Sequence, residues 1–322
     1  MSAPVEVRGA SKWYGAVIGI NEVDLDLAPG ITGLLGPNGA GKSTLIKLIA
    51  GTLRPSLGEV RVFGLPAATT PAARAAIGYL PEVDGFYEDL SGREFVRSMA
   101  RLTGLRATEA RERTEKVLVE VGMQALAKKR LKACSKGMRQ RIKLAQALVH
   151  DPQVLILDEP LSGIDVAGRR ELMDLFRRFG AAGKTVLVST HILEEIEEIT
   201  DRIVLMAGGR VLASGTVGSI RDLLDEHPLT VRIVATRARE LAADLLSREE
   251  VTGVAVGDVS TVAIGGKAGD GIAELTVKVK AGDRFFRAFP ALALARGAEV
   301  KRIEPLDASA EAIFQYLIGG KS

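Results

Sequence analysis

The residues best suited to chemistry lie in a glycine-rich segment near the start of the chain, GPNGAGKST at residues 36–44. The segment fits G-x-x-x-x-G-K-[ST], the pattern of a loop that wraps the phosphates of a nucleotide. Its glycines let the backbone approach an anion closely, and the positive end of the following helix points at that anion. The Lys42 ammonium suits the β- and γ-phosphates, and the Ser43 hydroxyl suits Mg²⁺. The pattern predicts a nucleoside triphosphate site formed by Gly36, Pro37, Asn38, Gly39, Ala40, Gly41, Lys42, Ser43 and Thr44.

A pair of carboxylates is the second group with chemical potential. The continuously apolar residues Val154–Leu157 predict a strand buried on both faces of a parallel sheet, and Asp158 and Glu159 follow it directly. Open α/β sheets bind their ligands at the carboxyl ends of such strands. Asp158 is the expected Mg²⁺ ligand, directly or through water, and Glu159 is the expected general base for an attacking water. Because the chain lacks the N-K-x-D pattern of base-reading GTPases, we expect ATP hydrolysis.

Short apolar segments predict the elements that position these groups. A strand at residues 31–36 and a helix at residues 43–51 flank the glycine-rich segment, which disfavours a purely structural turn there. From about residue 84 to residue 150, helical periodicity replaces the strands. Further strands are expected at residues 5–7, 20–28, 59–63, 76–80, 185–190 and, as a hairpin, 202–215. We therefore predict an α/β fold, a P-loop NTPase core with a mixed, largely parallel sheet, antiparallel N-terminal strands and a helical insert.

The C-terminal part of the chain predicts a separate small α+β domain. We expect the nucleotide-binding domain to span residues 1–225 and the smaller domain to span residues 226–322. Strands are expected at residues 229–234, 251–256, 259–264, 274–279 and 298–305, with helices at 237–247, 282–295 and 309–318. That order suggests a sandwich of the ferredoxin-like kind.

Composition limits the classes of function that remain. The chain of 322 residues is 47% hydrophobic, 26% charged and 4% aromatic, with a net charge of +3, so we expect no nucleic-acid partner. Cys134 is the only cysteine, which fits a reducing compartment. The first ten residues lack the apolar core of a signal peptide, and no apolar run is long enough to span a bilayer. We expect a cytoplasmic location.

These motifs, in this order, make residues 5–221 resemble the nucleotide-binding subunit of an ATP-binding cassette (ABC) transporter. Taken alone, Tyr14 is more simply a cap on a sheet edge, and His191 an ordinary core or surface residue. The resemblance implies instead that Tyr14 stacks on adenine and that His191 contacts the γ-phosphate. It also places Glu82 near Mg²⁺ and the lytic water, where the family usually has Gln. We expect this carboxylate to alter metal affinity or the placement of water.

A further implication of the resemblance is a second subunit. The family signature Leu-Ser-Gly-Gly-Gln corresponds to CSKGM here, with Ser135 and Gly137 at the start of a helix whose amides form an anion site. By resemblance, this site closes on ATP held by another cassette, with Asp165 in the inter-subunit loop. The implied partners are a second ATP-binding subunit, in a homodimer, and integral-membrane permease subunits. The chain would then lie on the inner face of the cell membrane. GYLPE and SKGM resemble a branch that serves compact exporters of drugs, lipids or polysaccharides.

Two alternatives stay open at this point. A soluble cassette ATPase could act on ribosomes or DNA, although such proteins usually carry two cassettes or long coiled coils. This chain has one phosphate loop and no sustained heptads. The C-terminal domain could alternatively sense a ligand and regulate the ATPase. Since it shows no ligand-specific group of residues, a dimer-stabilising or capping domain is the simpler interpretation.

Overall fold

The computed structural model describes residues 3–219, 229–260, 272–280 and 282–306. The chain forms two compact units, Met1–Val217 and Gly218–Ser322. The predicted boundary between residues 225 and 226 lies outside the described residues, as does the predicted last helix at residues 309–318. Within the described ranges, no helix has both the length and the apolar character needed to cross a bilayer.

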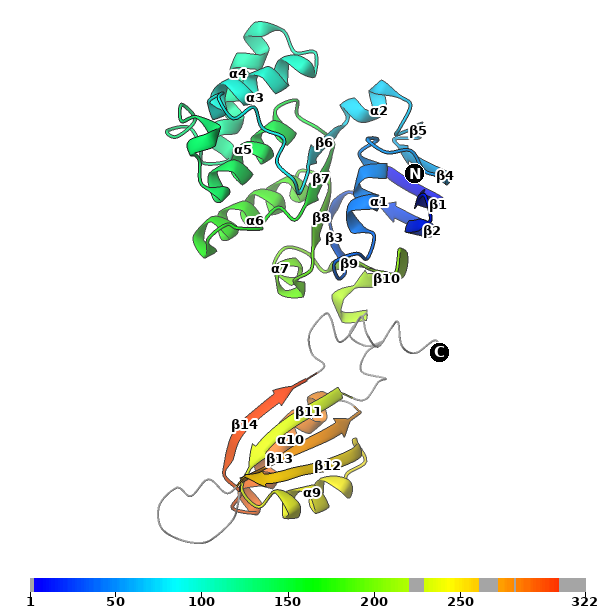
Figure 1. Cartoon of the computed structure of the whole chain (residues 1–322), viewed down its shortest axis with the longest axis vertical. Coiled ribbons are helices and arrows are strands. Elements are labelled where there is room, and N and C mark those ends of the chain that lie inside the picture. The colour runs from blue at the N-terminus through cyan, green and yellow to red at the C-terminus, as the bar shows by residue number, and fades with distance from the viewer. Residues whose placement is uncertain (1–2, 220–228, 261–271, 281, 307–322) are drawn as a thin grey trace. The chain divides into compact units, whose positions relative to one another are not determined.

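A six-stranded sheet forms the centre of the first unit (Figure 1). Its strands, in spatial order, are β10 (Arg210–Thr216), β9 (Arg202–Ala207), β3 (Gly30–Leu35), β8 (Thr185–Thr190), β7 (Val154–Asp158) and β6 (Ile77–Leu80). From β9 to β6 all neighbours pair in parallel, whereas β10 pairs antiparallel with β9 at the edge. Because parallel strands end at one edge of their sheet, the segments that follow β3, β6, β7 and β8 meet there.

The N-terminal strands form a second, antiparallel sheet. In spatial order it contains β2 (Val17–Leu27), β1 (Val5–Tyr14), β4 (Leu57–Val62) and β5 (Leu65–Pro66). The helix α1 (Lys42–Ile49) lies between the two sheets in Figure 1, and its buried leucines and isoleucines share one core with residues of both sheets. β1 extends well beyond the predicted residues 5–7. The reason is a set of register shifts, which break the alternation that would reveal a longer strand.

Helices cover the central sheet and build the insert. They are α2 (Pro71–Ala75), α3 (Gly92–Leu102), α4 (Ala107–Glu120), α5 (Lys136–Leu148), α6 (Val166–Ala181) and α7 (Leu193–Glu197). The start of α3 is fixed by a capping box between Ser91 and Glu94. The sequence analysis did not predict α2, because five residues are too few to show a helical period. The predicted fold class is confirmed.

The second unit has the element order β-α-β-β-α-β. Its elements are β11 (Leu229–Ala235), α9 (Ala238–Leu246), β12 (Val251–Ser260), β13 (Ile272–Val279), α10 (Gly282–Ala295) and β14 (Val300–Pro305). The strands lie in the order β12-β13-β11-β14 and pair antiparallel, an arrangement of the ferredoxin-like kind. Separate strands at residues 251–256 and 259–264 were a wrong prediction. Residues 251–260 are one strand, with a register shift where Gly257 and Asp258 resemble a turn, and residues 261–264 lie outside the described part.

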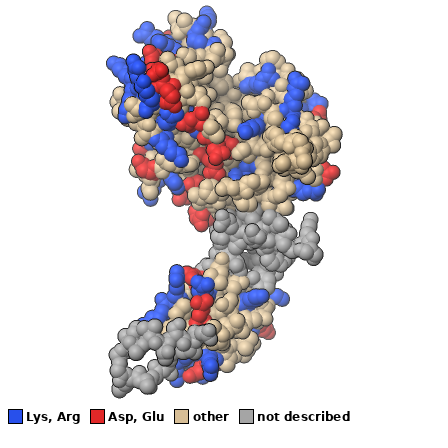
Figure 2. Space-filling view, viewed as in Figure 1, with Lys and Arg blue, Asp and Glu red and all other residues tan. Residues whose placement is uncertain are grey.

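The visible surface of the first unit mixes both signs of charge. Figure 2 shows acidic side chains gathered in a band across this face, with basic side chains on both sides of the band. This mixture agrees with the small net charge of +3. Many of the charges are paired, as in the contacts of Arg139 with Asp84 and Glu88.

We predict that Phe285→Ala destabilises the second unit. Phe285 is 1% exposed, and its ring stacks on Phe289 with the centroids 5.4 Å apart. Truncating a buried phenylalanine should lower the free energy of unfolding by about 3–5 kcal/mol. Denaturant-dependent hydrogen exchange of peptides from β11 and β13 measures this locally. Leu294→Ala, at a residue of the same helix that is 82% exposed, is the control; an equal effect of both substitutions would contradict the assignment of this core.

Candidate nucleotide-binding site

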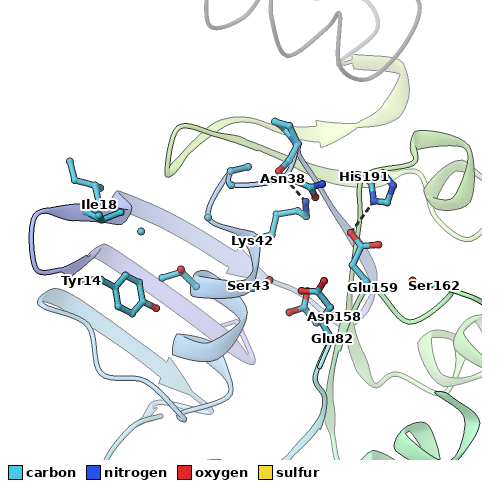
Figure 3. Close-up of a pocket in the computed structure, with 17 residues that line it drawn as sticks. Tyr14, Ile18, Asn38, Lys42, Ser43, Glu82, Asp158, Glu159, Ser162 and His191 are labelled. Atoms are coloured by element: carbon cyan, nitrogen blue, oxygen red, sulfur yellow. Dashed lines mark hydrogen bonds and ion pairs between the residues drawn. The ribbon is translucent and has the colours of Figure 1, made fainter. Parts of the chain in front are cut away.

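A cavity of about 630 Å³ opens at the edge of the central sheet where the parallel strands end (Figure 3). It brings together the phosphate loop after β3, Glu82 after β6, the acidic pair at the end of β7 and His191 after β8. Tyr14 at the end of β1 lines it as well. Further lining residues, which the sequence analysis did not single out, are Val17, Ile18, Gly19 and Ser162. Their contribution depends on long-range packing that has no local pattern in the sequence.

The phosphate loop requires glycine at two positions, Gly39 and Gly41. Gly39 and Gly41 both have positive φ, 81° and 100°, which favours glycine. A Cβ on Gly41 would also lie 2.6 Å from the carbonyl oxygen of Gly19, so the loop packs against β2 at this point. The helix α1 begins directly afterwards at Lys42. The loop amides and the positive end of α1 therefore face the cavity.

Lys42 is held inside the loop by backbone carbonyls. It is 7% exposed, and its Nζ donates hydrogen bonds to the carbonyl oxygens of Gly36 at 2.5 Å and Pro37 at 3.2 Å. Burial lowers the pKa of Lys42, while the charges of Glu159, Asp158 and Glu82 act to raise it. The ammonium thus belongs to a cluster of charges whose carboxylates come from the ends of two other strands. Phosphate oxygens are the kind of acceptor that could replace the two carbonyls.

Asp158 and Glu159 are oriented by a serine that the sequence analysis missed. Ser189 Oγ donates to Asp158 Oδ1 at 2.7 Å and accepts a hydrogen bond from the Glu159 amide at 3.0 Å. Asp158 is 1% exposed, and Glu159 has a positive φ of 48°, an uncommon conformation for a residue with a side chain. Ser189 lies near the end of β8, beside the end of β7. Its place at the carboxyl end of a predicted buried strand was the available signal.

Glu159 and His191 form a hydrogen-bonded pair at the mouth of the cavity. His191 Nδ1 lies 3.1 Å from Glu159 Oε1, as the dashed line in Figure 3 marks. Burial raises the pKa of Glu159, partly offset by the hydrogen bond and charge of His191 and by the charge of Lys42. A carboxylate with a raised pKa is a better proton acceptor than an ordinary one. The pair therefore has the chemistry of a general base with an orienting partner.

Oxygen ligands for a cation converge beside the phosphate loop. Ser43, Glu82 and Asp158 all line the cavity, and Figure 3 shows both carboxyl groups directed toward the side where Ser43 lies. Hydroxyl and carboxylate oxygens suit Mg²⁺, which usually keeps waters and takes phosphate oxygens from its substrate. In the described part of the chain, no group of three or more His, Cys, Asp or Glu could hold a metal ion. Ser43, Glu82 and Asp158 offer the oxygen donors that suit Mg²⁺ when it takes its further ligands from phosphates.

Four residues predicted to bind nucleotide do not line this cavity. One of them, Gly36, directly precedes the lining residues of the phosphate loop. Ser135 caps α5, where its Oγ accepts a hydrogen bond from the Met138 amide at 3.3 Å. Asp165 caps α6 by accepting from the Gly168 amide at 2.7 Å, and Gly137 lies in the first turn of α5. The structure brings Tyr14, residues 37–44, Glu82, the acidic pair and His191 together, and leaves these four residues outside the cavity.

The fold and the cavity together define a nucleoside triphosphatase of the P-loop class. A family model described as ABC transporter matches residues 20–162. The daunorubicin/doxorubicin resistance ATP-binding protein DrrA of Streptomyces peucetius is 37% identical over 247 residues, covering 76% of this chain and 75% of that protein. The Nod factor export ATP-binding protein I of Cupriavidus metallidurans is 35% identical over 224 residues, with coverages of 69% and 74%. The chain therefore belongs to the family of ABC transporter ATP-binding subunits.

Solved structures agree with this assignment. The structure of an ATP-binding subunit of an ABC transporter superposes with a TM-score of 0.63 at 32% identity, covering 69% of this chain and 93% of that one. A dimeric cassette in a post-hydrolysis state with ADP and phosphate superposes with a TM-score of 0.62 at 23% identity, covering 66% and 98%, and shows the shared fold. The predicted family, and the predicted activity of an ATP-hydrolysing transporter subunit, are confirmed.

The raised pKa of Glu159 predicts a pH-dependent effect of Glu159→Gln on stability. The folded state binds the carboxyl proton more tightly than the unfolded state, so wild-type stability falls as pH rises from about 4.3 through the raised pKa. Glutamine cannot ionise, so its stability relative to wild type should be higher at about pH 7 than at about pH 4. Urea unfolding at both pH values measures this. Glu112→Gln on the exposed surface of α4 is the control, and an unchanged difference between the two pH values would exclude a destabilising buried charge at Glu159.

Proposed function

We propose that this subunit hydrolyses Mg²⁺-bound ATP at an interface with a second ATP-binding subunit and thereby drives an integral-membrane exporter. The observation that carries the proposal is the content of the cavity. The phosphate loop, Glu82, Asp158, Glu159 and His191 share it, whereas the signature residues lie outside it. The cavity of one chain therefore contains a binding loop for the triphosphate and a general base. The second anion-binding surface, which the family signature supplies, would have to come from another chain.

The proposed roles in binding follow from chemistry and position. Residues 36–44 wrap the phosphates, with backbone N–H groups from every residue except Pro37. Lys42 exchanges its carbonyl partners for β- and γ-phosphate oxygens. The ring of Tyr14, which is 47% exposed, offers a platform for adenine. Ser43, Asp158 and Glu82 hold Mg²⁺. When bound, the metal would neutralise charge on the phosphates.

In the proposed reaction Glu159 is the general base. It accepts a proton from a water molecule whose oxygen attacks the γ-phosphorus, and the bond from that phosphorus to the bridging oxygen of ADP breaks. His191 holds Glu159 through the 3.1 Å hydrogen bond. In this proposal the same imidazole would also contact the γ-phosphate. Ser189 holds the backbone amide of Glu159 and the carboxylate of Asp158. The products are ADP and inorganic phosphate.

The second half of the site is proposed to come from an identical chain. Ser135 and Gly137 lie at the start of α5, where unpaired amides and the positive helix end favour an anion. Asp165 lies at the start of α6, in the loop assigned to the subunit interface. ATP would favour the closed dimer because its γ-phosphate contacts both chains, and hydrolysis removes that differential contact.

The direction of transport is proposed from the relatives. Family members act with membrane permeases, and the names of two relatives describe drug resistance and export. We infer an exporter permease as the partner and a position on the inner face of the cell membrane. We also propose that residues 1–225 are the nucleotide-binding domain and that residues 226–322 are a separate domain that stabilises the dimer or caps the cassette.

Glu159→Gln should separate binding from hydrolysis. Because glutamine cannot accept the proton, phosphate release should fall about 100- to 10,000-fold, while ATP binding stays close to that of wild type. The variant should accumulate as a dimer with Mg²⁺-ATP, measured by light scattering after size exclusion, and return to monomer when ATP is removed. Glu112→Gln is the matched control. A variant that is monomeric under all conditions would contradict the proposed sandwich.

Membrane extracts test the proposed partner. We expect the tagged full-length chain to co-purify, in mild detergent, with a polytopic membrane protein that has about six apolar spans of ~20 residues. Addition of that partner should change the rate of ATP hydrolysis. Recovery of the chain with ribosomes or DNA, and without a membrane protein, would favour the alternative of a soluble cassette ATPase.

A further inference from the structure

The helix α5 contains a lysine whose charge is directed into the protein. Lys143 is 3% exposed. Its Nζ donates to the carbonyl oxygens of Pro81 and Glu82, both at 3.0 Å, and lies 3.0 Å from Asp84 Oδ1. An ammonium has three N–H donors, so these three acceptors satisfy it completely. A buried charge is costly unless it is paired in this way, and all of its partners belong to the segment that carries Glu82.

Arg139, one turn earlier on α5, holds the rest of that segment. Its Nε donates to Asp84 Oδ2 at 2.7 Å, and its terminal nitrogens donate to the Glu88 carboxylate at 2.7 and 2.9 Å. The guanidinium also lies 4.7 Å from the centre of the Phe86 ring. Although burial acts to raise it, the hydrogen bonds from Arg139 and Lys143 hold the pKa of Asp84 below its usual range. Residues 81–88 are therefore bound to α5 along their length.

Gln140 makes the corresponding connection to the acidic pair. It is 5% exposed, and its Nε2 donates to the carbonyl oxygens of Glu159 at 3.1 Å and Pro160 at 2.8 Å. Lys136, one turn earlier, donates to Ser162 Oγ at 3.3 Å. Residues 136, 140 and 143 are spaced by four and three positions and lie on one face of the helix. That face holds two separate segments, one bearing Glu82 and the other bearing Glu159.

We propose that Gln140 and Lys143 are positioning residues for ATP hydrolysis. They bind the backbones of Glu82 and Glu159 to one helix, so that α5 sets how the two carboxylates are placed in the cavity. Neither side chain lines the cavity itself, so neither contacts the nucleotide. The inference rests on the proposed function, since it takes Glu159 as the base and Glu82 as a neighbour of Mg²⁺. It deepens that function by naming what connects the two.

The same helix links this site to the proposed subunit interface. α5 begins at Lys136, directly after Ser135, where the nucleotide of the second subunit is proposed to bind. A contact with the start of α5 would therefore act on the helix that holds the Glu82 and Glu159 segments of the same chain. The hydrogen bonds of Gln140 and Lys143 therefore connect one nucleotide site with the other through a single helix.

The test compares Lys143→Met with Lys184→Met in the full-length chain. Lys184 is also a largely buried lysine, with Asp151 at 2.6 Å and the Pro152 carbonyl at 2.8 Å. It directly precedes β8, so it lies at the amino ends of the parallel strands, away from the cavity. In Lys143→Met, kcat should fall about 10- to 100-fold, because loss of a partner that orients a catalytic group typically lowers activity by this factor. The Kd for a fluorescent ATP analogue should stay within about threefold of wild type. Lys184→Met should keep kcat within about twofold.

A merely structural role of Lys143 would give a different result. Removing one partner of a buried ion pair would lower the stability of the fold and leave the kcat of the folded protein unchanged. Overturning outcomes are a kcat within about twofold of wild type in Lys143→Met, an equal loss in Lys184→Met, or a parallel loss of nucleotide affinity. If Lys143→Met does not fold, Gln140→Met, which removes two neutral hydrogen bonds, is judged by the same criteria.

Hydrogen exchange separates this inference from the proposed function. Mg²⁺-ATP should protect the peptide covering residues 81–88 in wild type and in Lys184→Met, and that protection should be lost in Lys143→Met. Absence of Mg²⁺-dependent phosphate release from wild type would overturn the proposed mechanism. The exchange data would still decide the inference: protection that persists in Lys143→Met shows that the helix does not control the segment, whatever the activity.

Discussion

The nucleotide site depends on one electrostatic balance, a buried ammonium opposed by three carboxylates. Lys42 is driven toward neutrality by burial and kept charged by Glu159, Asp158 and Glu82. The three acids reach it because β6 and β7 run parallel to β3, the strand before the phosphate loop, and all three strands end on the same side of one sheet. Neither the acids nor the lysine would be stable alone in this place, since an unpaired buried charge is strongly unfavourable. The parallel sheet thus gathers one positive and three negative charges from three segments, and the excess of negative charge suits a divalent cation.

Local features of the sequence were sufficient to predict the elements that carry this balance. The glycine-rich loop lies between a strand and a helix that both have clear apolar patterns, and Val154–Leu157 is apolar throughout, as a doubly covered strand must be. Residues at the ends of such strands meet by topology alone. Asp158, Glu159 and the loop therefore could be predicted to share a site without knowledge of any side-chain contact, whereas Glu82 was assigned to it through the family resemblance.

The contacts that orient those residues could not be predicted in this way. Ser189, Gln140 and Lys143 act across 31, 20 and 61 positions of the sequence respectively, and nothing near them in the chain marks their partners. β1 and β12 were mispredicted for a related reason: register shifts interrupt the period-two pattern within a continuous strand. Ser135 and Asp165 show a third limit, because a single chain reveals them only as helix caps. Their proposed partner lies on another molecule.

Glu82 illustrates how a departure from the family pattern can be absorbed. An amide at this position would leave Lys42 opposed by two carboxylates, whereas the glutamate adds a third charge that favours the protonated amine. The same charge would attract a divalent cation beside Ser43 and Asp158. The backbone of Glu82 is held by Lys143, which uses all three of its N–H donors on residues 81–84. These contacts restrict movement of the segment toward a bound cation. An additional negative charge is therefore accompanied by an additional buried positive charge behind it. The Lys143 ammonium thus offsets the charge that Glu82 has and an amide would lack. Because Lys143 belongs to α5, the placement of Glu82 depends on that helix.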